Sequence, residues 1–588
     1  MHTLISYRDV TFTGGFWAAL QERNRLATMS AVEARFRETG RFDAFRCKTA
    51  WPEGKKPHIF WDSDVAKWME SAAYILQKRA DPALESAVEE LIGLIEKNQG
   101  DDGYFNIYFT VVEPENRWQN RHAHELYCAG HLIEAAVAWR EATGRDRFLN
   151  CMLKYAAYIE KVFMREGSAE FRTPGHEEIE LALVKLWRCT GDERWLRLGE
   201  WFVERRGSGE EPFDDEYMQS HAPVREQRTA EGHAVRAMYL CCAMADLALV
   251  RGDAGLRAAC EALFENVTQK RMYVTGGIGS TPSGERFTFD YDLPNETAYA
   301  ETCAAIGLAL FSRRMSLLEP DARYADAAER AVCNGFLSGV SEDGRSFFYE
   351  NPLEINFGTR KRGGRFPITQ RKEVFDCSCC PPNVTRFIAS FGDFLFSRDG
   401  DTLYVHHYAS AAAPGIGMTT EYPADGHIAL RLRNMAGKRV ALRIPGWCEA
   451  FHCDAEGLLD RGYYRVDIRS DDYTLGLTLE MPARLVYAHP DVQENIGRAA
   501  VMRGPVVYCL EGVDNGGNLR ALAIPANAAF TGGFDALECE GYRLEGTDAL
   551  YSPAPPKRVP QRLKFIPYHR FANRGESEMM VWVKAEGG

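Results

Sequence analysis

The sequence predicts an (α/α)6 barrel followed by C-terminal all-β sandwich domains. A helical hairpin recurs from about residue 60 to residue 340, and the pattern changes to short alternating segments after Phe396. Repetition of a two-helix unit is typical of closed helical arrays, and short strands separated by Gly, Asp and Asn are typical of β-sandwiches. With 588 residues, of which 45% are hydrophobic, the chain is long enough to build several cores.

Each hairpin consists of an apolar helix, a short polar turn and an amphipathic helix. The turns, such as Thr190-Gly191-Asp192 and Arg251-Gly252-Asp253, hold a Gly that stops the first helix and an Asp that can cap the second. First helices are expected to begin near residues 62, 124, 176, 231, 301 and 383. The amphipathic stretch from Phe16 to Thr39 supplies the sixth outer helix, and closure into a ring is inferred from the count.

The change of pattern divides the chain into three expected domains. The catalytic barrel is expected at residues 13–397, and a β-sandwich at 398–489, with the N-terminal strand 1–12 as a candidate addition. A second β-rich domain is expected at 490–588, interrupted by the Pro-rich segment 552–556. The polar stretch Arg398-Asp399-Gly400-Asp401 suits the first boundary.

Composition excludes several classes of protein. The formal net charge of -13 argues against a nucleic-acid partner, which a basic patch would normally serve. The 16 cysteines are scattered and lie mostly in apolar helical runs, which indicates reduced core residues more than a disulfide framework. No apolar stretch approaches membrane-spanning length and the first residues lack the pattern of a signal peptide, so we expect a cytoplasmic protein without a membrane partner.

Two cysteine-containing segments are the most informative local feature. One is Cys377-Ser378-Cys379-Cys380 and the other is Glu301-Thr302-Cys303. Adjacent cysteines rarely pair with each other, but they readily share one soft metal ion. Together the segments supply three thiolates and a carboxylate, which suits tetrahedral Zn²⁺. A purely structural zinc site, or simply buried apolar cysteines, remains an alternative at this point.

Polar side chains gather at the expected starts of the six first helices. In a barrel these inner helices run parallel, so their N-termini meet at one end and favour anions and thiolates there. Any one of these residues alone would more often be a helix cap or a hydrogen-bonded core residue. Only the set as a whole indicates a functional site. Its members are Asp62, Asp64, His124, Glu125, His176, Glu177, His233, Glu301, Cys303, Cys379 and Cys380.

A Gly-rich loop precedes the fifth inner helix and ends at Glu285. It lacks the Gly-Lys-Ser/Thr ending of a phosphate-binding loop. An isolated Glu would more often be solvated, but Glu285 lies 16 residues before Glu301 on the segment that enters the same helix. We therefore expect the loop to deliver Glu285 to the pocket.

Read in order, these motifs resemble glycoside hydrolase family 127, the β-L-arabinofuranosidase family, whose fold is an (α/α)6 barrel followed by β-sandwich domains. The resemblance spans the helical domain and reaches the C-terminal region. The matching stretches are 62–68, 124–131, 173–177, 221–225, 232–236, 276–279, 301–303, 377–383 and 503–508.

The resemblance implies a retaining exo-glycosidase that releases terminal β-L-arabinofuranose from oligosaccharides or glycoconjugates, with a cysteine as nucleophile. It implies Cys379 as that nucleophile and Glu285 as the acid/base. Zn²⁺ would be held by Glu301, Cys303, Cys379 and Cys380, and His124, His176 and His233 would bind the sugar, with Asp62 and Asp64 as further candidates. Cys377 matches a position near the site without being assigned to the metal, and a homodimer is implied by resemblance alone.

Other functions remain open from the sequence. A family member could act on an acidic sugar, recognised by a basic and aromatic segment before the second helix. A sugar epimerase or uronyl hydrolase with the same barrel and a structural zinc is a second alternative, and a glycan-binding protein without activity is a third. The segment consists of Arg46, Lys48, Trp51, Lys55, Lys56 and His58.

Overall fold

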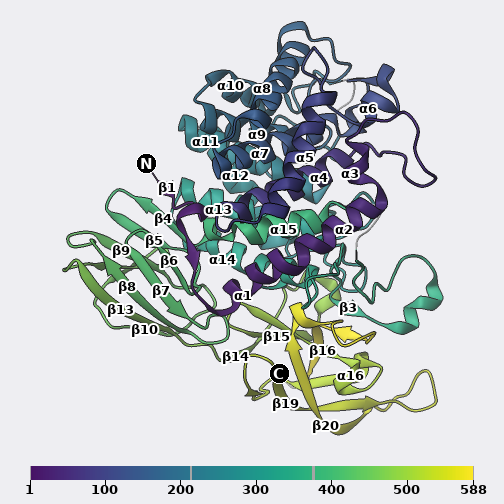
Figure 1. Ribbon diagram of the computed structural model, residues 1–588. Coiled ribbons are helices and arrows are strands. Elements are labelled where there is room, and N and C mark those ends of the chain that lie inside the picture. Colours follow the sequence, from purple (N-terminus) through teal and green to yellow (C-terminus); the bar gives the residue numbers. More distant parts are fainter. Residues whose placement is uncertain (1, 212–214, 374–377, 587–588) are drawn as a thin grey trace.

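The computed structural model describes residues 2–211, 215–373 and 378–586. It consists of a helical barrel followed by C-terminal β-rich domains, as predicted (Figure 1). Cys377 lies outside the described residues. Among the helices in these ranges, none combines the length and apolar character needed to cross a membrane.

Six inner helices form a closed ring. Each packs against the next one along the chain, and the last packs back against the first. They begin within a few residues of the predicted positions and are largely buried, which explains why their sequences are apolar on most faces. They are α4 (Trp61–Leu76), α7 (Glu125–Thr143), α9 (Ile179–Thr190), α11 (Ala234–Arg251), α13 (Thr302–Leu318) and α15 (Cys380–Ser390).

The outer helices surround this ring, and most begin at a capping aspartate. Asp192 and Asp253 each accept a hydrogen bond from a backbone N–H in the first turn of the following helix, as Asp81 and Asp321 also do. The predicted amphipathic stretch near the N-terminus forms two consecutive helices. The outer helices are α1 (Gly15–Arg23) with α2 (Met29–Thr39), α5 (Pro82–Asn98), α8 (Arg147–Ile159), α10 (Glu193–Arg205), α12 (Ala254–Asn266) and α14 (Ala322–Arg330).

Two six-stranded sheets follow the barrel. In the strand 427–433, Ile428, Leu430 and Leu432 are buried and the alternate residues are exposed, the pattern of a sheet with one solvated face. In spatial order the first sheet is β1 (Thr3–Leu4), β4 (Phe396–Asp399), β5 (Thr402–Val405), β9 (Arg439–Arg443), β12 (Tyr463–Asp467) and β11 (Leu458–Asp460). The second is β10 (Phe451–Cys453), β13 (Asp472–Leu479), β8 (His427–Arg433), β7 (Ile416–Thr420), β6 (Ala411–Ala413) and β2 (Thr11–Phe12).

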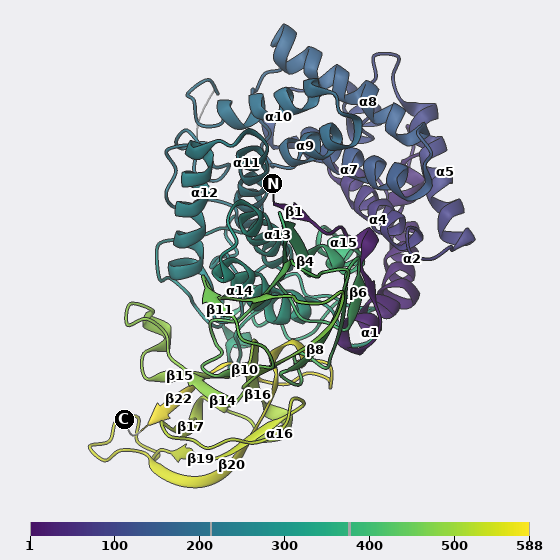
Figure 2. The ribbon, with the colours of Figure 1, turned by 90° about the vertical axis from the view of Figure 1, so that its left-hand side faces the viewer.

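The N-terminal residues belong to these two sheets. β1 pairs antiparallel with β4 and β2 pairs antiparallel with β6, so each adds one edge strand before the chain enters α1. Figure 2 shows β1 beside β4, close to the ends of the inner helices. The barrel and these sheets also share one hydrophobic core, which runs from α4 and α15 to buried residues of β5 and β8.

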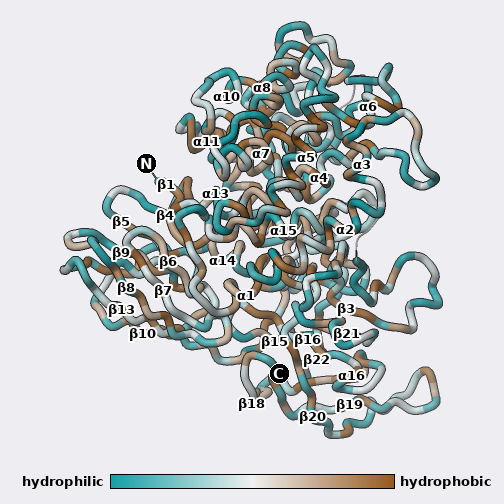
Figure 3. Tube along the Cα trace, in the orientation of Figure 1, coloured by the Kyte–Doolittle hydropathy of each residue, from teal (hydrophilic) through white to brown (hydrophobic). Residues whose placement is uncertain are grey.

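The C-terminal region forms a ten-stranded sheet that includes a strand from the barrel segment. β3 (Glu354–Ile355), between α14 and α15, pairs with β21 (Met579–Met580). In Figure 3 the peripheral loops are mainly hydrophilic, and hydrophobic residues run through the barrel and its junction with the β domains. The other strands are β14 (Ala483–Val486), β15 (Arg498–Arg503), β16 (Val506–Glu511), β17 (Leu522–Pro525), β18 (Thr531–Gly532), β19 (Leu537–Glu545), β20 (Lys557–Pro567) and β22 (Trp582–Glu586).

A buried ion pair joins the barrel to the first pair of sheets. Arg443 on β9 is fully buried, and its guanidinium contacts both carboxylate oxygens of Glu329 on α14. Asp326 accepts a second bond from Arg443 at 2.6 Å, and Tyr422 donates to Glu329 at 2.6 Å. Charges removed from water in this way are tolerated only while they remain paired.

We expect Arg443→Met to destabilise the protein strongly, because it leaves the carboxylate of Glu329 buried without a cation. The loss should be about 3–5 kcal/mol by analogy with other broken buried pairs. The double variant Arg443→Met/Glu329→Met should recover part of this loss, since only Asp326, which is more exposed than Glu329, then lacks its cation. Thermal unfolding of the three proteins checks the prediction, and equal melting temperatures for both variants would contradict it.

Candidate active site

The N-terminal ends of the six inner helices surround one cavity. It has a volume of about 200 Å³, which leaves room for one small ligand. Five inner helices contribute a side chain themselves or through the residue immediately before them, and His176 enters from the loop three residues before the sixth, α9. The lining residues are Phe60, Ser63, Asp64, His124, Tyr127, His176, Tyr217, His233, Val235, Arg236, Tyr239, Glu285, Glu301, Cys303, Tyr349 and Cys379.

The predicted thiol and carboxylate residues meet at the start of α13 and α15. The Sγ atom of Cys303 lies 3.3 Å from that of Cys380 and 3.8 Å from that of Cys379, and the latter two are 3.7 Å apart. Glu301 Oε1 lies 3.5 Å from both Cys379 and Cys380. Prolines at the first helical positions of α15 need no N–H partner and allow the helix to begin at Cys380.

This cluster fits a tetrahedral zinc ion. The four ligand atoms all lie within 4.8 Å of one another. Zinc–ligand bonds of tetrahedral geometry place sulfurs about 3.8 Å apart and a sulfur and an oxygen about 3.6 Å apart. Four of the five measured distances agree closely, and the Cys303–Cys380 separation is shorter. Soft sulfur donors with one carboxylate suit zinc.

The cluster also stabilises negative charge on sulfur. Burial raises the pKa of the Cys303 thiol, but hydrogen bonds from Cys379 and Cys380 outweigh it and bring that pKa to about 6. Burial and the neighbouring thiols raise the pKa of Cys380 well above its ordinary value. Among these two thiols, the thiolate form is therefore favoured at Cys303.

Two of the three predicted histidines present a hydrogen-bond acceptor to the cavity. The Nδ1–H of His124 donates to the carbonyl of His122 at 2.8 Å, and that of His176 donates to the carbonyl of Glu177 at 2.9 Å. Burial lowers the pKa of His124 to about 3 and that of His176 well below its usual range. Both rings are therefore neutral, with Nε2 left as the acceptor.

The third histidine positions the predicted acid/base residue. His233 Nδ1 accepts the backbone N–H of Val235 and caps α11, so the ring proton is on Nε2, 2.9 Å from Glu285 Oε2. Burial lowers the pKa of His233 and raises that of Glu285, but hydrogen bonds from His233 and Tyr299 outweigh burial and lower the pKa of Glu285. A neutral His233 thus donates to the Glu285 carboxylate, which the Gly-rich loop delivers to the cavity as predicted.

Of the two predicted aspartates, only Asp64 lines the cavity. Its Oδ2 is held 2.9 Å from Arg41 Nε, and its Oδ1 lacks a hydrogen-bond partner among the described residues. Asp62 does not reach the cavity, because residues two apart on a helix point in different directions. Its Oδ1 accepts the backbone N–H of Ile107 instead, and burial raises its pKa to about 7.

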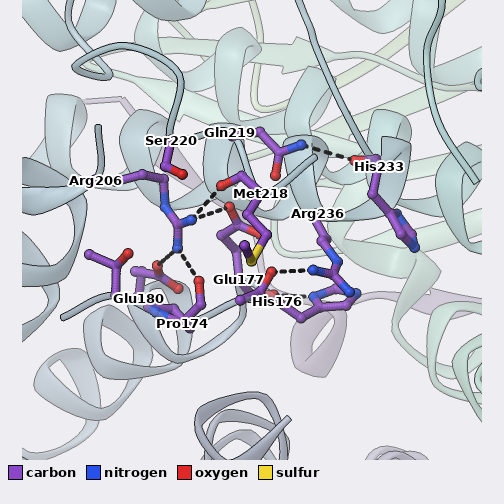
Figure 4. Close-up of polar contacts among 12 residues, drawn as sticks. Pro174, His176, Glu177, Glu180, Arg206, Met218, Gln219, Ser220, His233 and Arg236 are labelled. Carbon is purple, nitrogen blue, oxygen red and sulfur yellow. Dashed lines mark hydrogen bonds and ion pairs between the residues drawn. The ribbon is translucent and has the colours of Figure 1, made fainter. Parts of the chain in front are cut away.

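The two rim glutamates also face away from the cavity and hold the loops behind it. Glu177 lies 2.9 Å from the guanidinium of the buried Arg206, which also donates to the carbonyls of Pro174 and Met218 (Figure 4). Glu125 accepts bonds from Tyr104 and from a backbone N–H. These residues fix the segments that carry His124 and His176.

Several cavity residues were missed from the sequence. Tyr127 is one helical turn after His124, and Arg236 is one turn after His233, so the helical period could have identified both. Tyr239 follows Arg236 by a further turn. Tyr349, 3.1 Å from the sulfur of Cys379, belongs to an irregular segment and carried no such signal.

The basic segment before α4 does not line the cavity. Arg46 pairs with Asp43 and Glu90 on the outer surface. His58 packs against Phe60, with ring centroids 4.1 Å apart, and only Phe60 reaches the cavity wall. Within the described residues, the acidic-sugar alternative therefore receives no support from this segment.

We expect Asp62→Asn to change how stability depends on pH. A folded-state pKa of about 7, above the ordinary value for aspartate, contributes stability that is lost as pH rises from about 4 to about 7. The variant lacks this loss, so its melting temperature relative to the native protein should rise over that range and level off above it. The underlying slope is at most about 1.4 kcal/mol per pH unit. A difference that stays constant between pH 4.5 and 8 would contradict the assignment.

Comparisons with known proteins agree with this geometry. The family model of the β-L-arabinofuranosidase GH127 catalytic domain matches residues 9–393, and that of the glycoside hydrolase family 127 C-terminal domain matches residues 483–584. A non-reducing end β-L-arabinofuranosidase of Bifidobacterium longum subsp. longum is 36% identical over 586 residues, covering 89% of each chain.

Solved structures with the same fold include two close relatives. A GH127 β-L-arabinofuranosidase from Geobacillus stearothermophilus T6 is 40% identical with a TM-score of 0.91, covering 98% of this chain and 100% of that chain. A GH127 β-arabinofuranosidase is 32% identical with a TM-score of 0.91, covering 100% of this chain and 98% of that chain. The chain belongs to glycoside hydrolase family 127 and is a glycoside hydrolase.

Proposed function

We propose that this glycoside hydrolase is a retaining exo-glycosidase that releases terminal β-L-arabinofuranose from oligosaccharides or glycoconjugates. The observation that carries the proposal is that the sulfur of Cys379 and the carboxylate of Glu285 line the same small cavity. The relative from Bifidobacterium longum, named for action at a non-reducing end, supports the choice of sugar and of a terminal position.

The proposed nucleophile needs a stabilised thiolate. When bound to Glu301, Cys303, Cys379 and Cys380, a zinc ion would keep these thiols deprotonated at neutral pH and stabilise sulfur as a leaving group. The helix N-termini of α13 and α15 contribute in the same direction. Tyr349 is positioned beside Cys379 and helps to fix the direction of its sulfur.

Hydrolysis proceeds in two displacements. In the first, the sulfur of Cys379 forms a bond to the anomeric carbon, the bond to the leaving oxygen breaks, and the Glu285 carboxyl group donates its proton to that oxygen. In the second, the Glu285 carboxylate takes a proton from water, the water oxygen attacks the anomeric carbon, and the electron pair of the C–S bond returns to Cys379. Two inversions retain the configuration.

The first step requires a protonated Glu285. In the free protein its pKa is lowered, because bonds from His233 and Tyr299 outweigh burial. A bound sugar would displace water from the cavity and disfavour the carboxylate, which raises the pKa toward that of an acid catalyst. The hydrogen bond from His233 keeps the carboxyl group directed during both steps.

Hydrogen-bond acceptors in the cavity recognise the hydroxyl groups of the sugar. Nε2 of His124, Nε2 of His176 and Oδ1 of Asp64 belong to buried or largely enclosed groups whose other polar atom is already hydrogen-bonded. Sugar hydroxyls are the donors that such a set selects, and each unmade bond would leave a buried acceptor unsatisfied.

We expect Cys379→Ser to abolish release of arabinose from an aryl β-L-arabinofuranoside, because a hydroxyl is neither acidic nor soft enough to replace the thiolate. Cys128→Ser is the matched control, since this buried cysteine of α7 does not line the cavity and donates to a backbone carbonyl, as serine can. Full turnover in Cys379→Ser, or an epimer as the product in place of free sugar, would contradict the thiol mechanism and favour the epimerase alternative.

Glu285→Gln should slow hydrolysis by about 10²–10⁴-fold, the range for loss of an acid/base residue. With a good leaving group the first step survives and the second does not, so the variant should accumulate a sugar on Cys379. Intact mass spectrometry of the denatured protein would show the added pentosyl group. Its absence in Glu285→Gln, with activity lost, would contradict the covalent route.

The purified protein should contain one zinc ion per chain by elemental analysis. Glu301→Gln and Cys303→Ser should reduce this content, because each removes an anionic ligand of the cluster. Cys128→Ser should keep the native content. Full zinc in both ligand variants would exclude this cluster as the metal site.

A further inference from the structure

Lys67 has no role in the reaction as described, yet it is a buried cation next to the active site. Its side chain lies on α4, and the residue is 1% exposed. Its ammonium nitrogen lies 2.8 Å from the hydroxyl oxygen of Tyr127, to which it donates a hydrogen bond. Among the described residues, no carboxylate lies within 4.0 Å of this nitrogen. A buried ammonium group is stabilised when an anion lies nearby.

The nearby carboxylates on the same helix are already used. Asp64, one turn before Lys67, pairs with Arg41. Glu70, one turn after it, pairs with Lys185 and Arg386. Neither of them forms an ion pair with Lys67.

The cavity side holds the cysteine cluster. Tyr127, which receives the hydrogen bond from Lys67, lines the cavity together with Cys303 and Cys379, and it packs in the same buried cluster as Cys303 and Cys380. Lys67 therefore stands directly behind a side chain that contacts the anionic region.

Lys67 and a second cation offset the charge of the metal cluster itself, and the Glu285 carboxylate is a further negative charge in the cavity. One carboxylate and three thiolates around a divalent ion leave two negative charges. Two buried cations near the cavity have no carboxylate within 4.0 Å in the described part of the chain, namely Lys67 and Arg236. Arg236 lines the cavity itself, whereas Lys67 acts from behind Tyr127.

We propose that Lys67 is a positioning residue that supplies counter-charge to the metal–thiolate cluster, with Tyr127 holding its ammonium group in place. This inference rests on the proposed function, because it assumes that the cluster carries a divalent ion. The hydroxyl oxygen of Tyr127 accepts the hydrogen bond from Lys67, so the O–H proton of Tyr127 points away from Lys67. Because Tyr127 lines the cavity, this proton is directed toward the cavity.

The test compares neutral and charged replacements of Lys67 by their affinity for zinc. Lys67→Gln keeps a hydrogen-bond donor toward Tyr127 but removes the charge, and Lys67→Arg keeps the charge. Competition with a chromogenic chelator should show zinc binding about 10–100-fold weaker in Lys67→Gln, the usual effect of losing a group that supports metal ligands. Lys67→Arg should recover most of the affinity.

Lys185→Met is the matched control, because this lysine belongs to the same inner ring but pairs with Glu70 and Glu134. It should lower the melting temperature and leave zinc affinity unchanged. If Lys67→Gln does not fold, Lys67→Met serves as the second neutral variant. A neutral variant that binds zinc as tightly as the native protein would overturn the proposal.

The zinc site and the role of Lys67 are tested separately. If the native protein binds zinc and hydrolyses the arabinofuranoside, but Lys67→Gln binds zinc equally tightly, only the role of Lys67 is wrong. If the native protein does not bind zinc at all, the metal assignment fails and the role of Lys67 fails with it. A merely structural role would lower the melting temperatures of Lys67→Gln and Lys67→Arg together, with unchanged zinc affinity.

Discussion

The parallel direction of the six inner helices is the constraint on which the site depends. Because each helix begins at the same end of the barrel, residues far apart in sequence, such as Glu301 and Cys379, meet there. Helix N-termini carry partial positive charge, so this end favours a carboxylate and thiolates over neutral side chains. Closure of the ring, with α15 packing on α4, is what converts six separate helix starts into one cavity.

Burial disfavours the charged forms of the polar side chains around the cavity. The hydrogen bonds there determine which of these groups remain charged. His124 and His176 are fixed as neutral acceptors by backbone carbonyls, whereas His233 is fixed as a donor by capping α11. Arg206 occupies the space behind the loop before α9, where it neutralises Glu177 and binds two carbonyls. The protonation states that the proposed sugar binding needs are therefore set before a ligand arrives, which would reduce the reorganisation that catalysis requires.

The sequence was informative where the physics is local. Gly and Asp in the turns predicted the hairpins because capping and helix termination involve neighbouring residues, and the cysteine spacing predicted the cluster because both segments begin helices. It failed where direction matters: Asp62 and Asp64 look equivalent in sequence, but one faces Ile107 and the other the cavity. The contribution of Tyr349 could not be predicted either, because its position is set by packing against a domain more than two hundred residues later.

The C-terminal sheet helps to position Tyr349 in the active site. The segment after Tyr349 is tied to this sheet, since β3 pairs with β21, Val581 donates its N–H to the carbonyl of Leu353, and Tyr568 donates to the carbonyl of Pro352. At its other end the same segment accepts the N–H of Thr302 at the carbonyl of Tyr349, where α13 begins. The hydroxyl of Tyr349 then lies beside the sulfur of Cys379. Hydrogen bonds from the last strands of the chain thus hold the segment that carries Tyr349, and Tyr349 contacts the proposed nucleophile. The β-rich domain contributes none of the cavity-lining side chains found in the described residues.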